Sequence, residues 1–195
     1  MTIRILGGRW KGRRLASVPG GGTRPLLGQV REALFQILGK KVEGAAVWDL
    51  FAGTGATGIE AVSRGARSVL FVERGREALR CLRANLELVR SLDPDLDLEW
   101  RRGDAWKPPP EASVPDLCFV DPPYADPREN PLGCIERLDS LLGALAPDGR
   151  LVFHHPRGAF LETELCALAA RRSCAIDHRR YGEAALAIFH RRTPS

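Results

Sequence analysis

The residues best suited to chemistry follow a short apolar run. Residues 116–120 read Asp-Leu-Cys-Phe-Val, a pattern typical of a buried strand, and Asp121, Pro122, Pro123 and Tyr124 come next. Two prolines stiffen the backbone, so the Asp121 carboxylate and a prolyl carbonyl are expected to face one spot as acceptors. An exocyclic amine there offers two N–H donors, and Tyr124 can stack on the base that carries it. The stretch predicts an amine clamp; taken alone, a rigid strand-end turn explains it equally well.

A second stretch predicts a nucleotide site. Residues 47–60 run from an apolar strand through Gly53, Gly55 and Gly58 into a helical pattern, and the G-x-G-x-x-G spacing also fits a dinucleotide loop. The strand carries Asp49 near its carboxyl end. A carboxylate there repels a pyrophosphate but can hold a cationic or amine-bearing ligand. S-adenosylmethionine (SAM) carries a sulfonium and an amine, so Asp49 favours SAM over NAD.

Two later strand ends carry further carboxylates. Residues 68–73 end on Glu73, about 20 residues after the glycine loop, where related folds bind ribose hydroxyls. Asp104 follows a third strand, at 96–101, and can accept a hydrogen bond from an adenine amino group. The simpler alternatives are a solvated strand cap for Glu73 and a turn residue for Asp104. The predicted cofactor contacts are Asp49, Phe51, Gly53, Gly55, Glu73, Arg74, Asp104 and Ala105.

Positive charge is concentrated at the amino end. The chain has a net charge of +5, and residues 1–41 contain nine Lys and Arg against Glu32 alone. Residues 9–15 interleave cations with an aromatic ring and a flexible glycine, so they can lie along a phosphate backbone with Trp10 free to stack on a base. The alternatives are a solvated basic hairpin and, for Arg31, an ordinary surface charge on a helix at 26–38. The predicted substrate contacts are Arg9, Trp10, Lys11, Arg13, Arg24 and Arg31.

The composition argues against disulfide-rich, metal-binding, membrane and secreted proteins. Five cysteines, widely spaced and without a C-x-x-C pair, are expected to be small buried hydrophobes; neither a disulfide framework nor a metal site is expected. The chain has no apolar run of 18 residues and no secretory h-region near Met1, so neither a membrane partner nor secretion is expected. We therefore expect a cytoplasmic protein, and a monomer.

The order of apolar runs predicts an α/β fold. It resembles the Rossmann-like class I methyltransferase sheet, with seven mostly parallel strands, an antiparallel last strand and helices on both faces. Residues 1–43 are predicted to form a small basic hairpin and helix extension, and residues 44–195 the SAM-dependent methyltransferase domain. His154 and His155 are adjacent in the strand at 150–155, so they point to opposite faces. A structural role is expected for them, although one can line the substrate pocket.

Several blocks together resemble the bacterial 16S ribosomal RNA guanine-N2 methyltransferases of the RsmD type. The more specific block is N-terminal; the glycine loop and D-P-P-Y are shared by many amino-methyltransferases. The resemblance spans nearly the whole chain, in residues 4–15, 23–25, 30–35, 49–60, 63–66 and 121–124.

The resemblance implies SAM-dependent methylation of the exocyclic N2 of one guanine in the 16S RNA of the small ribosomal subunit. It assigns catalysis to Asp121 and Tyr124, and Pro122 completes the predicted clamp. The chain departs from the family pattern at residues 26–29, where Leu-Leu-Gly-Gln replaces a threonine and an acidic residue. Any capping or substrate role there is in doubt.

Two other functions fit the same motifs. A DNA or RNA adenine-N6 methyltransferase would use a similar loop and clamp, but more often has Asn where this chain has Asp121, and residues 1–195 show no separate target-recognition domain. A non-catalytic RNA-binding protein on a methyltransferase scaffold is the second alternative. This alternative predicts that the protein does not bind SAM.

Overall fold

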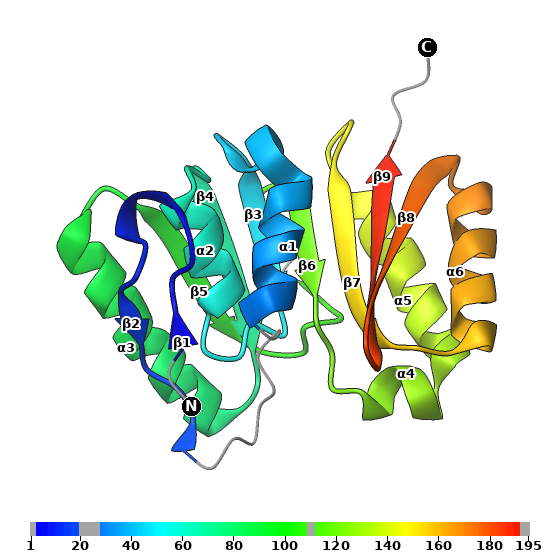
Figure 1. The fold of residues 1–195 in the computed structure, drawn as a ribbon, viewed down its shortest axis with the longest axis horizontal. Helices are drawn as coiled ribbons and strands as arrows, with labels where there is room; N and C mark the ends of the chain where they lie inside the picture. Colours follow the sequence, from blue (N-terminus) through cyan, green and yellow to red (C-terminus); the bar gives the residue numbers. More distant parts are fainter. Residues whose placement is uncertain (1–2, 20–27, 109–111, 192–195) are drawn as a thin grey trace. The chain divides into compact units, whose positions relative to one another are not determined.

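The protein is an α/β structure built on a seven-stranded sheet (Figure 1). The computed structural model describes residues 3–19, 28–108 and 112–191. The strand order is β5-β4-β3-β6-β7-β9-β8. Strand β9 runs antiparallel to both neighbours, whereas the β3–β4, β4–β5 and β6–β7 pairs are parallel. The predicted fold class is confirmed.

The chain divides into two units, Met1–Ala112 and Ser113–Ser195. In the first unit, the first two parallel strands are each followed by a helix that leads to the next strand. This unit contains β3 (Ala46–Leu50), α2 (Ala56–Ser63), β4 (Ser68–Glu73), α3 (Arg76–Leu92) and β5 (Asp97–Arg102), preceded by α1 (Gly28–Leu38) and the 3-10 turn η3 (Gly39–Val42). Every residue of β3 is buried, as expected for a parallel strand covered on both faces. On α3 the apolar side is buried, as its 3.6-residue spacing predicts.

An N-terminal segment, residues 3–16, packs on α2 and α3 of the first unit (Figure 1). It contains the antiparallel pair β1 (Ile3–Arg4) and β2 (Arg14–Leu15), with the 3-10 turn η1 (Gly8–Trp10) between them. Side chains from the two helices bind its backbone. Glu60 accepts from Leu6 N at 2.7 Å, Ser63 Oγ accepts from Trp10 N at 3.1 Å and donates to Gly7 O at 2.7 Å, and Asn85 exchanges two hydrogen bonds with Ala16.

Gly8 is the tightest point of this packing. Its φ is +74°, and a Cβ added there would lie 1.9 Å from the Ser63 carbonyl oxygen. We expect Gly8→Ala to lower the free energy of unfolding by about 1 to 3 kcal/mol, because the segment must move off α2. Urea unfolding and limited trypsin digestion, with earlier cleavage at Lys11 and Arg13, measure the effect. Gly28→Ala is the control, since no described residue lies within 4 Å of its added Cβ; equal losses in the two variants would contradict the prediction.

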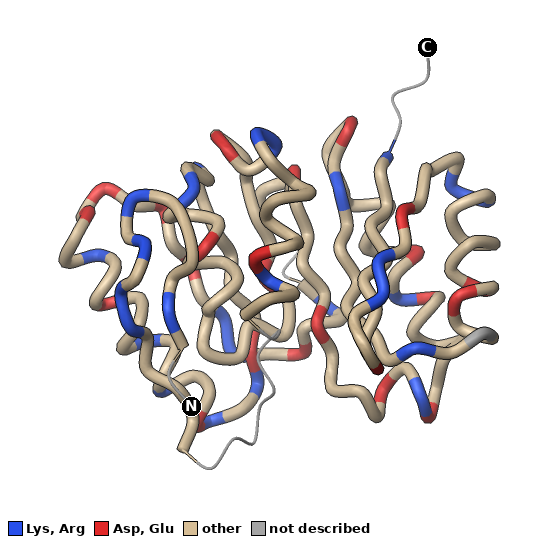
Figure 2. The backbone as a smooth tube through the Cα atoms, viewed as in Figure 1, with Lys and Arg blue, Asp and Glu red and all other residues tan. Residues whose placement is uncertain are grey.

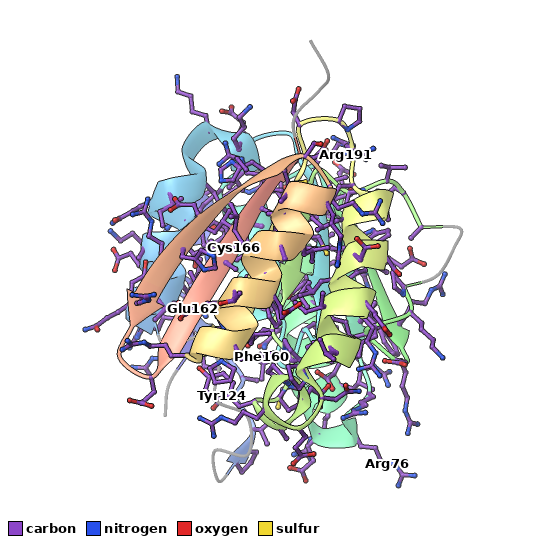
Figure 3. The ribbon with its side chains drawn as sticks, turned by 90° about the vertical axis from the view of Figure 1, so that its right-hand side faces the viewer. Arg76, Tyr124, Phe160, Glu162, Cys166 and Arg191 are labelled. Atoms are coloured by element: carbon purple, nitrogen blue, oxygen red, sulfur yellow. The ribbon has the colours of Figure 1, made fainter. Side chains whose placement is uncertain are left out.

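The second unit continues the α/β pattern and closes with an antiparallel hairpin. It contains β6 (Leu117–Val120), α4 (Ala125–Glu129), α5 (Pro131–Ala144), β7 (Arg150–Pro156), α6 (Ala159–Arg171), β8 (Cys174–Tyr181) and β9 (Ala184–Arg191). Figure 3 views this unit from the side of α6, which carries the labelled Glu162 and Cys166 beside β8 and β9. The short helix α4 was not predicted. It follows the D-P-P-Y stretch directly, and Pro127 lies buried within it.

His155, on β7, is fully buried. Its ring stacks on Phe153 at 5.1 Å, and Nδ1 lies 2.8 Å from the Pro156 carbonyl oxygen. Among the residues that the structure describes, Nε2 has no hydrogen-bond partner. Burial lowers the pKa of His155 from 6.5 to about 4, against a smaller opposing effect of the Pro156 carbonyl.

This lowered pKa predicts acid sensitivity. Between about pH 4 and 6.5, the unfolded chain binds a proton at His155 that the folded chain does not bind, so stability is lost as the pH falls through this window. The full contribution is roughly 3 kcal/mol. Urea unfolding at pH 4.5, 5.5 and 7 should show a smaller pH dependence for His155→Phe than for the wild type. Equal pH dependences would contradict the prediction.

Two expectations from composition have structural outcomes. Cys81, Cys118 and Cys134 are buried, but Cys166 is exposed on α6 and Cys174 is half-buried, so the expectation that all five cysteines are buried was wrong. The amphipathic pattern of α6 leaves Cys166 on its outer side. Within the described ranges, no helix is both long enough and apolar enough to cross a bilayer.

Candidate active site

Asp49 lies near the carboxyl end of β3 and is 3 % exposed. Its Oδ2 accepts a hydrogen bond from Gly58 N at 2.8 Å, so the carboxylate caps the amino end of α2. Gly58 permits this close approach, because an added Cβ would lie 2.3 Å from the Phe71 ring and 2.9 Å from Asp49 Oδ2. The predicted close packing of strand and helix at Gly58 is confirmed. Asp49 thus brings a buried negative charge to the strand end.

The turn after β3 is held in left-handed backbone conformations. Phe51 has φ of 62°, Gly53 of 57° and Gly55 of 79°. Among the described residues, a Cβ on Gly53 would meet only the Phe51 carbonyl oxygen, at 3.9 Å, whereas a Cβ on Gly55 would lie 2.4 Å from Leu82. Gly53 therefore leaves open space beside the loop, and Gly55 makes room for the core. A positive φ at the non-glycine Phe51 is uncommon and is typical of functional turns.

Glu73, the last residue of β4, is hydrogen-bonded to the glycine loop. Its Oε2 accepts from Gly53 N at 2.8 Å, and its Oε1 accepts from Arg74 N and Gly75 N at 2.8 and 2.7 Å. These three bonds fix the orientation of the carboxylate. Each oxygen has two lone pairs, so Oε2 retains capacity for a ligand hydroxyl. Arg74 is exposed, and its backbone rather than its guanidinium makes this contact.

Asp104 is exposed in the turn after β5. Its Oδ1 accepts from Trp106 N at 3.1 Å, the hydrogen bond expected of a turn residue. Trp106 packs edge-on against Phe51, with ring centroids 5.0 Å apart, and Ala105 beside it is buried. The turns after β3 and β5 are therefore joined by an aromatic contact.

These carboxylates fit a cationic nucleoside. Parallel β3, β4 and β5 end at one edge, where ligands of such sheets bind, and beyond its chain neighbours no described side chain would lie within 4 Å of a Cβ added to Gly53 there. Asp49 and Glu73 supply negative charge and acceptors, which suits the amine and ribose hydroxyls of SAM and opposes a pyrophosphate. Within the described residues, no three His, Cys, Asp or Glu side chains are grouped to hold a metal ion.

The D-P-P-Y stretch follows β6 in the second unit, and its side chains meet a histidine from β7. Asp121 Oδ1 lies 2.6 Å from His154 Nδ1, and the Tyr124 hydroxyl lies 3.1 Å from His154 Nε2. The pairing follows from the parallel register, in which Val120 is opposite Phe153 and the next residues are Asp121 and His154. His154 is 8 % exposed. One imidazole therefore contacts both polar side chains of the predicted clamp.

The two prolines differ in their surroundings. Pro122 is buried and Pro123 is exposed. The Pro123 carbonyl accepts from Asp126 N at 3.0 Å and so begins α4. The Arg128 guanidinium from α4 lies 5.7 Å from the centre of the Tyr124 ring. The Pro123 carbonyl thus belongs to the turn that begins α4, and the clamp role of Pro122 stays a prediction.

Several Lys and Arg residues lie along the N-terminal segment, where the backbone is blue in Figure 2. Lys11 and Arg13 are exposed, and Arg9 is exposed and ion-paired with Asp93 at 2.6 Å. The expectation that Trp10 is free to stack on a base was wrong. Trp10 is 7 % exposed, because η1 packs on α2, and the Arg9 guanidinium lies 4.4 Å from its ring centre. Arg24 lies outside the described residues.

Arg31 is also buried, at 2 % exposure, so neither a surface charge nor a direct substrate contact fits its position. Its Nη2 donates to the Arg4 carbonyl at 2.5 Å, and its Nε lies 4.0 Å from Glu60 Oε2. Burial lowers the pKa of Arg31, while the charges of Glu60 and Asp49 oppose that shift. A buried cation is retained here because two buried carboxylates balance it. Arg31 thus joins α1 to the N-terminal segment by its hydrogen bond to Arg4, and its positive charge interacts with the Asp49 carboxylate.

Sequence reasoning missed two functional contacts. For His154 a structural role was expected, with lining of the substrate pocket as the alternative; its contact with Asp121 depends on the β6–β7 register, which the sequence does not give. Asn85 was not singled out. It is 2 % exposed on α3, and its Nδ2 donates both to Ala16 O and to Thr54 O in the glycine loop, at 3.1 and 2.9 Å. No sequence pattern marks a bridge between segments so far apart.

Comparisons with known proteins identify the family. The family described as "Conserved hypothetical protein 95" matches residues 3–190. A Bacillus subtilis protein named "Putative rRNA methyltransferase YlbH" is 32 % identical over 97 % of this chain and 100 % of its own length. Escherichia coli "Ribosomal RNA small subunit methyltransferase D" is 35 % identical over 63 % of this chain and 60 % of its own length.

A solved structure agrees with these relatives. It is described as "Putative methyltransferase yhhF from Escherichia coli", is 26 % identical and superposes with a TM-score of 0.77 over 100 % of both chains. The likeness covers the glycine loop, the D-P-P-Y stretch and the N-terminal segment alike. The chain therefore belongs to the Conserved hypothetical protein 95 family, the RsmD-type class I methyltransferases.

Proposed function

We propose that this protein transfers a methyl group from SAM to the exocyclic N2 of one guanine in the 16S RNA of the small ribosomal subunit. The observation that carries the proposal is the clamp at the end of β6, where Asp121 and Tyr124 are both held by His154. The substrate class is supported by the relatives, among them the small-subunit RNA methyltransferase of Escherichia coli.

The first unit is proposed to bind the cofactor. Asp49 provides the charge for the SAM amine and sulfonium, Glu73 accepts from the ribose hydroxyls, and the open side of Gly53 admits the ligand. The turn of Asp104 and Ala105 contacts the adenine. When bound, SAM supplies an electrophilic methyl group and retains the electron pair of the broken carbon–sulfur bond.

The second unit is proposed to hold the guanine. Asp121 Oδ2 and the Pro122 carbonyl accept the two N–H groups of N2, and Tyr124 stacks on the base. These contacts fix the direction of the nitrogen lone pair within the clamp, and positioning of this kind supplies much of the rate enhancement of a transfer reaction. As the nitrogen–carbon bond forms, one N–H proton passes to the Asp121 carboxylate and then to water. No covalent protein intermediate is required.

The exposed cations of the N-terminal segment are proposed to contact RNA phosphates. Lys11 and Arg13 are exposed, and the fixed backbone of residues 5–16 presents them on one surface. Trp10 and Arg31 support this segment from beneath and do not contact the RNA. Charge attraction of this type weakens steeply with added salt.

The test is methyl transfer from labelled SAM to undermethylated small subunits, free 16S RNA and duplex DNA in parallel. The proposal expects label in the subunit or its RNA. Transfer to duplex DNA alone would overturn it in favour of an adenine-N6 methyltransferase. SAM binding without transfer to any of the three substrates would overturn the assigned activity and substrate together.

A further inference from the structure

We propose that His154 is a positioning residue of the amine clamp, holding Asp121 and Tyr124 in register with the acceptor amine. This inference rests on the proposed function. Its basis is the chain of contacts Asp121 Oδ1 to His154 Nδ1, at 2.6 Å, and His154 Nε2 to the Tyr124 hydroxyl, at 3.1 Å.

The direction of the hydrogen bonds follows from the donors available. An ionised Asp121 carboxylate can only accept, so His154 Nδ1 carries the proton of the first bond. In the neutral imidazole, Nε2 then accepts from the Tyr124 hydroxyl. One tautomer thereby satisfies both nitrogens of a ring that is 8 % exposed.

The first bond fixes the carboxylate. The Asp121 side chain is 30 % exposed, whereas that of His154 is 9 % exposed, so a buried ring restrains a partly solvated group. With Oδ1 held by His154, Oδ2 is the oxygen that remains for an amine N–H. A freely rotating carboxylate would be in this orientation for only part of the time.

The second bond fixes the aromatic plane. The Tyr124 and His154 rings lie 5.4 Å apart and are tilted by 59°, and Arg128 approaches the Tyr124 ring at 5.7 Å. Tyr124 lies beyond the end of β6 and is labelled in Figure 3 near the amino end of α6. A tyrosine held by its hydroxyl presents its face to a base in one orientation, so the same histidine sets both stacking and hydrogen bonding.

The pairing of strand β7 restrains the position of His154. The strand is paired on both sides, with Val152 opposite Ile188 and His154 opposite Leu186 of β9, and with Phe153 opposite Val120 of β6. The adjacent His155 is fully buried on the opposite face. Both the backbone and the ring of His154 are therefore restrained before any substrate binds.

Three variants separate the two contacts. His154→Asn keeps an amide N–H near the position of Nδ1 and can still bind Asp121, His154→Gln reaches the position of Nε2 and can still bind Tyr124, and His154→Ala removes both contacts. We expect His154→Ala to lower kcat for transfer to small subunits by roughly 100-fold. His154→Asn and His154→Gln should each restore part of the loss, and SAM affinity measured by calorimetry should stay unchanged in all three.

His178→Ala is the matched control, because His178 is half-buried on β8 of the same unit and contacts Cys166 rather than the clamp. It should retain wild-type kcat. A wild-type kcat for His154→Ala would overturn the inference, as would equal kcat losses in all three His154 variants accompanied by equal losses of melting temperature.

A spectroscopic measurement tests the contacts without turnover. The chain has four histidines, so ¹⁵N imidazole spectra can be assigned by single substitutions. The inference expects His154 in the Nδ1–H form, with signals that change in Asp121→Asn. A His154 ring in the Nε2–H form would overturn the positioning role of His154, whether or not the wild-type protein transfers a methyl group. Wild-type protein that transfers no methyl group, yet shows the expected tautomer, would contradict the proposed function alone.

Discussion

Replacing Asp121 with alanine is expected to lower kcat for methyl transfer by a factor of about 10³, with SAM affinity unchanged. The variant loses both the acceptor that orients the amine and the group that takes its proton. SAM affinity should persist, because the proposed cofactor contacts all belong to residues 49–105 of the first unit. Single-turnover transfer to small subunits and calorimetry with SAM measure the two effects.

A matched carboxylate provides the control. Asp177→Ala removes a half-exposed aspartate of the second unit that is ion-paired with Arg179 at 2.7 Å. We expect its kcat to equal that of the wild type. If Asp121→Ala kept more than about a tenth of wild-type kcat, Asp121 would contribute less than a factor of ten to the rate. Positioning of the amine by the prolines alone would explain that result.

Replacing Asp49 with asparagine is expected to weaken SAM binding by about 10- to 100-fold, the usual value of a hydrogen bond to a charged group. The amide oxygen can still accept from Gly58 N, so α2 keeps its cap while the buried negative charge is lost. The Arg31 cation nearby then lacks one of its two balancing carboxylates, which adds repulsion toward a positively charged ligand. Calorimetry with SAM and with S-adenosylhomocysteine measures the loss.

Comparing the affinities for the two ligands separates the contribution of the sulfonium charge from that of the ligand's shape. S-adenosylhomocysteine has the amine but not the sulfonium, so Asp49→Asn should weaken SAM binding more than S-adenosylhomocysteine binding. Glu99→Gln, an exposed change on β5 beside Arg101, is the control and should leave both affinities unchanged. Equal affinities of Asp49→Asn and wild type for SAM would show that Asp49 only caps α2.

Much of the fold was predictable because hydrophobic spacing reports burial directly. The apolar run at 68–73 and the 3.6-residue spacing on α3 both match the structure. The carboxyl end of β6 was also predictable, since the prolines after Val120 cannot continue a central strand. In each case, the signal lies within one element and depends on no distant partner.

The N-terminal segment shows where local patterns fail. Its charge and glycines predicted a basic extension for RNA contact, but they did not predict that its backbone is held by Glu60, Ser63 and Asn85, which lie 53 to 69 positions further along the chain. Polar side chains that bind a distant backbone leave no periodic signal. Trp10 and Arg31 were misplaced for that reason: docking on α2 buries the first, and a buried Glu60 accommodates the second.

The glycine loop falls between these cases. Its spacing predicted a turn of unusual backbone angles, and Gly53 and Gly55 both have positive φ. The spacing could not separate their roles, since the packing of Leu82 against Gly55 comes from a helix that follows the next strand. The contact of His154 with Asp121 could not be predicted either, because it depends on the register of two strands.

The most direct test of the account is the identity of the nucleoside that carries the label after transfer from SAM to small ribosomal subunits. Digestion of the RNA to nucleosides and chromatography against standards give the answer in one measurement. The proposed function predicts a single labelled product, N2-methylguanosine, which disappears in Asp121→Ala. Label in N6-methyladenosine, or in a ribose-methylated nucleoside, would contradict the proposed amine clamp for guanine.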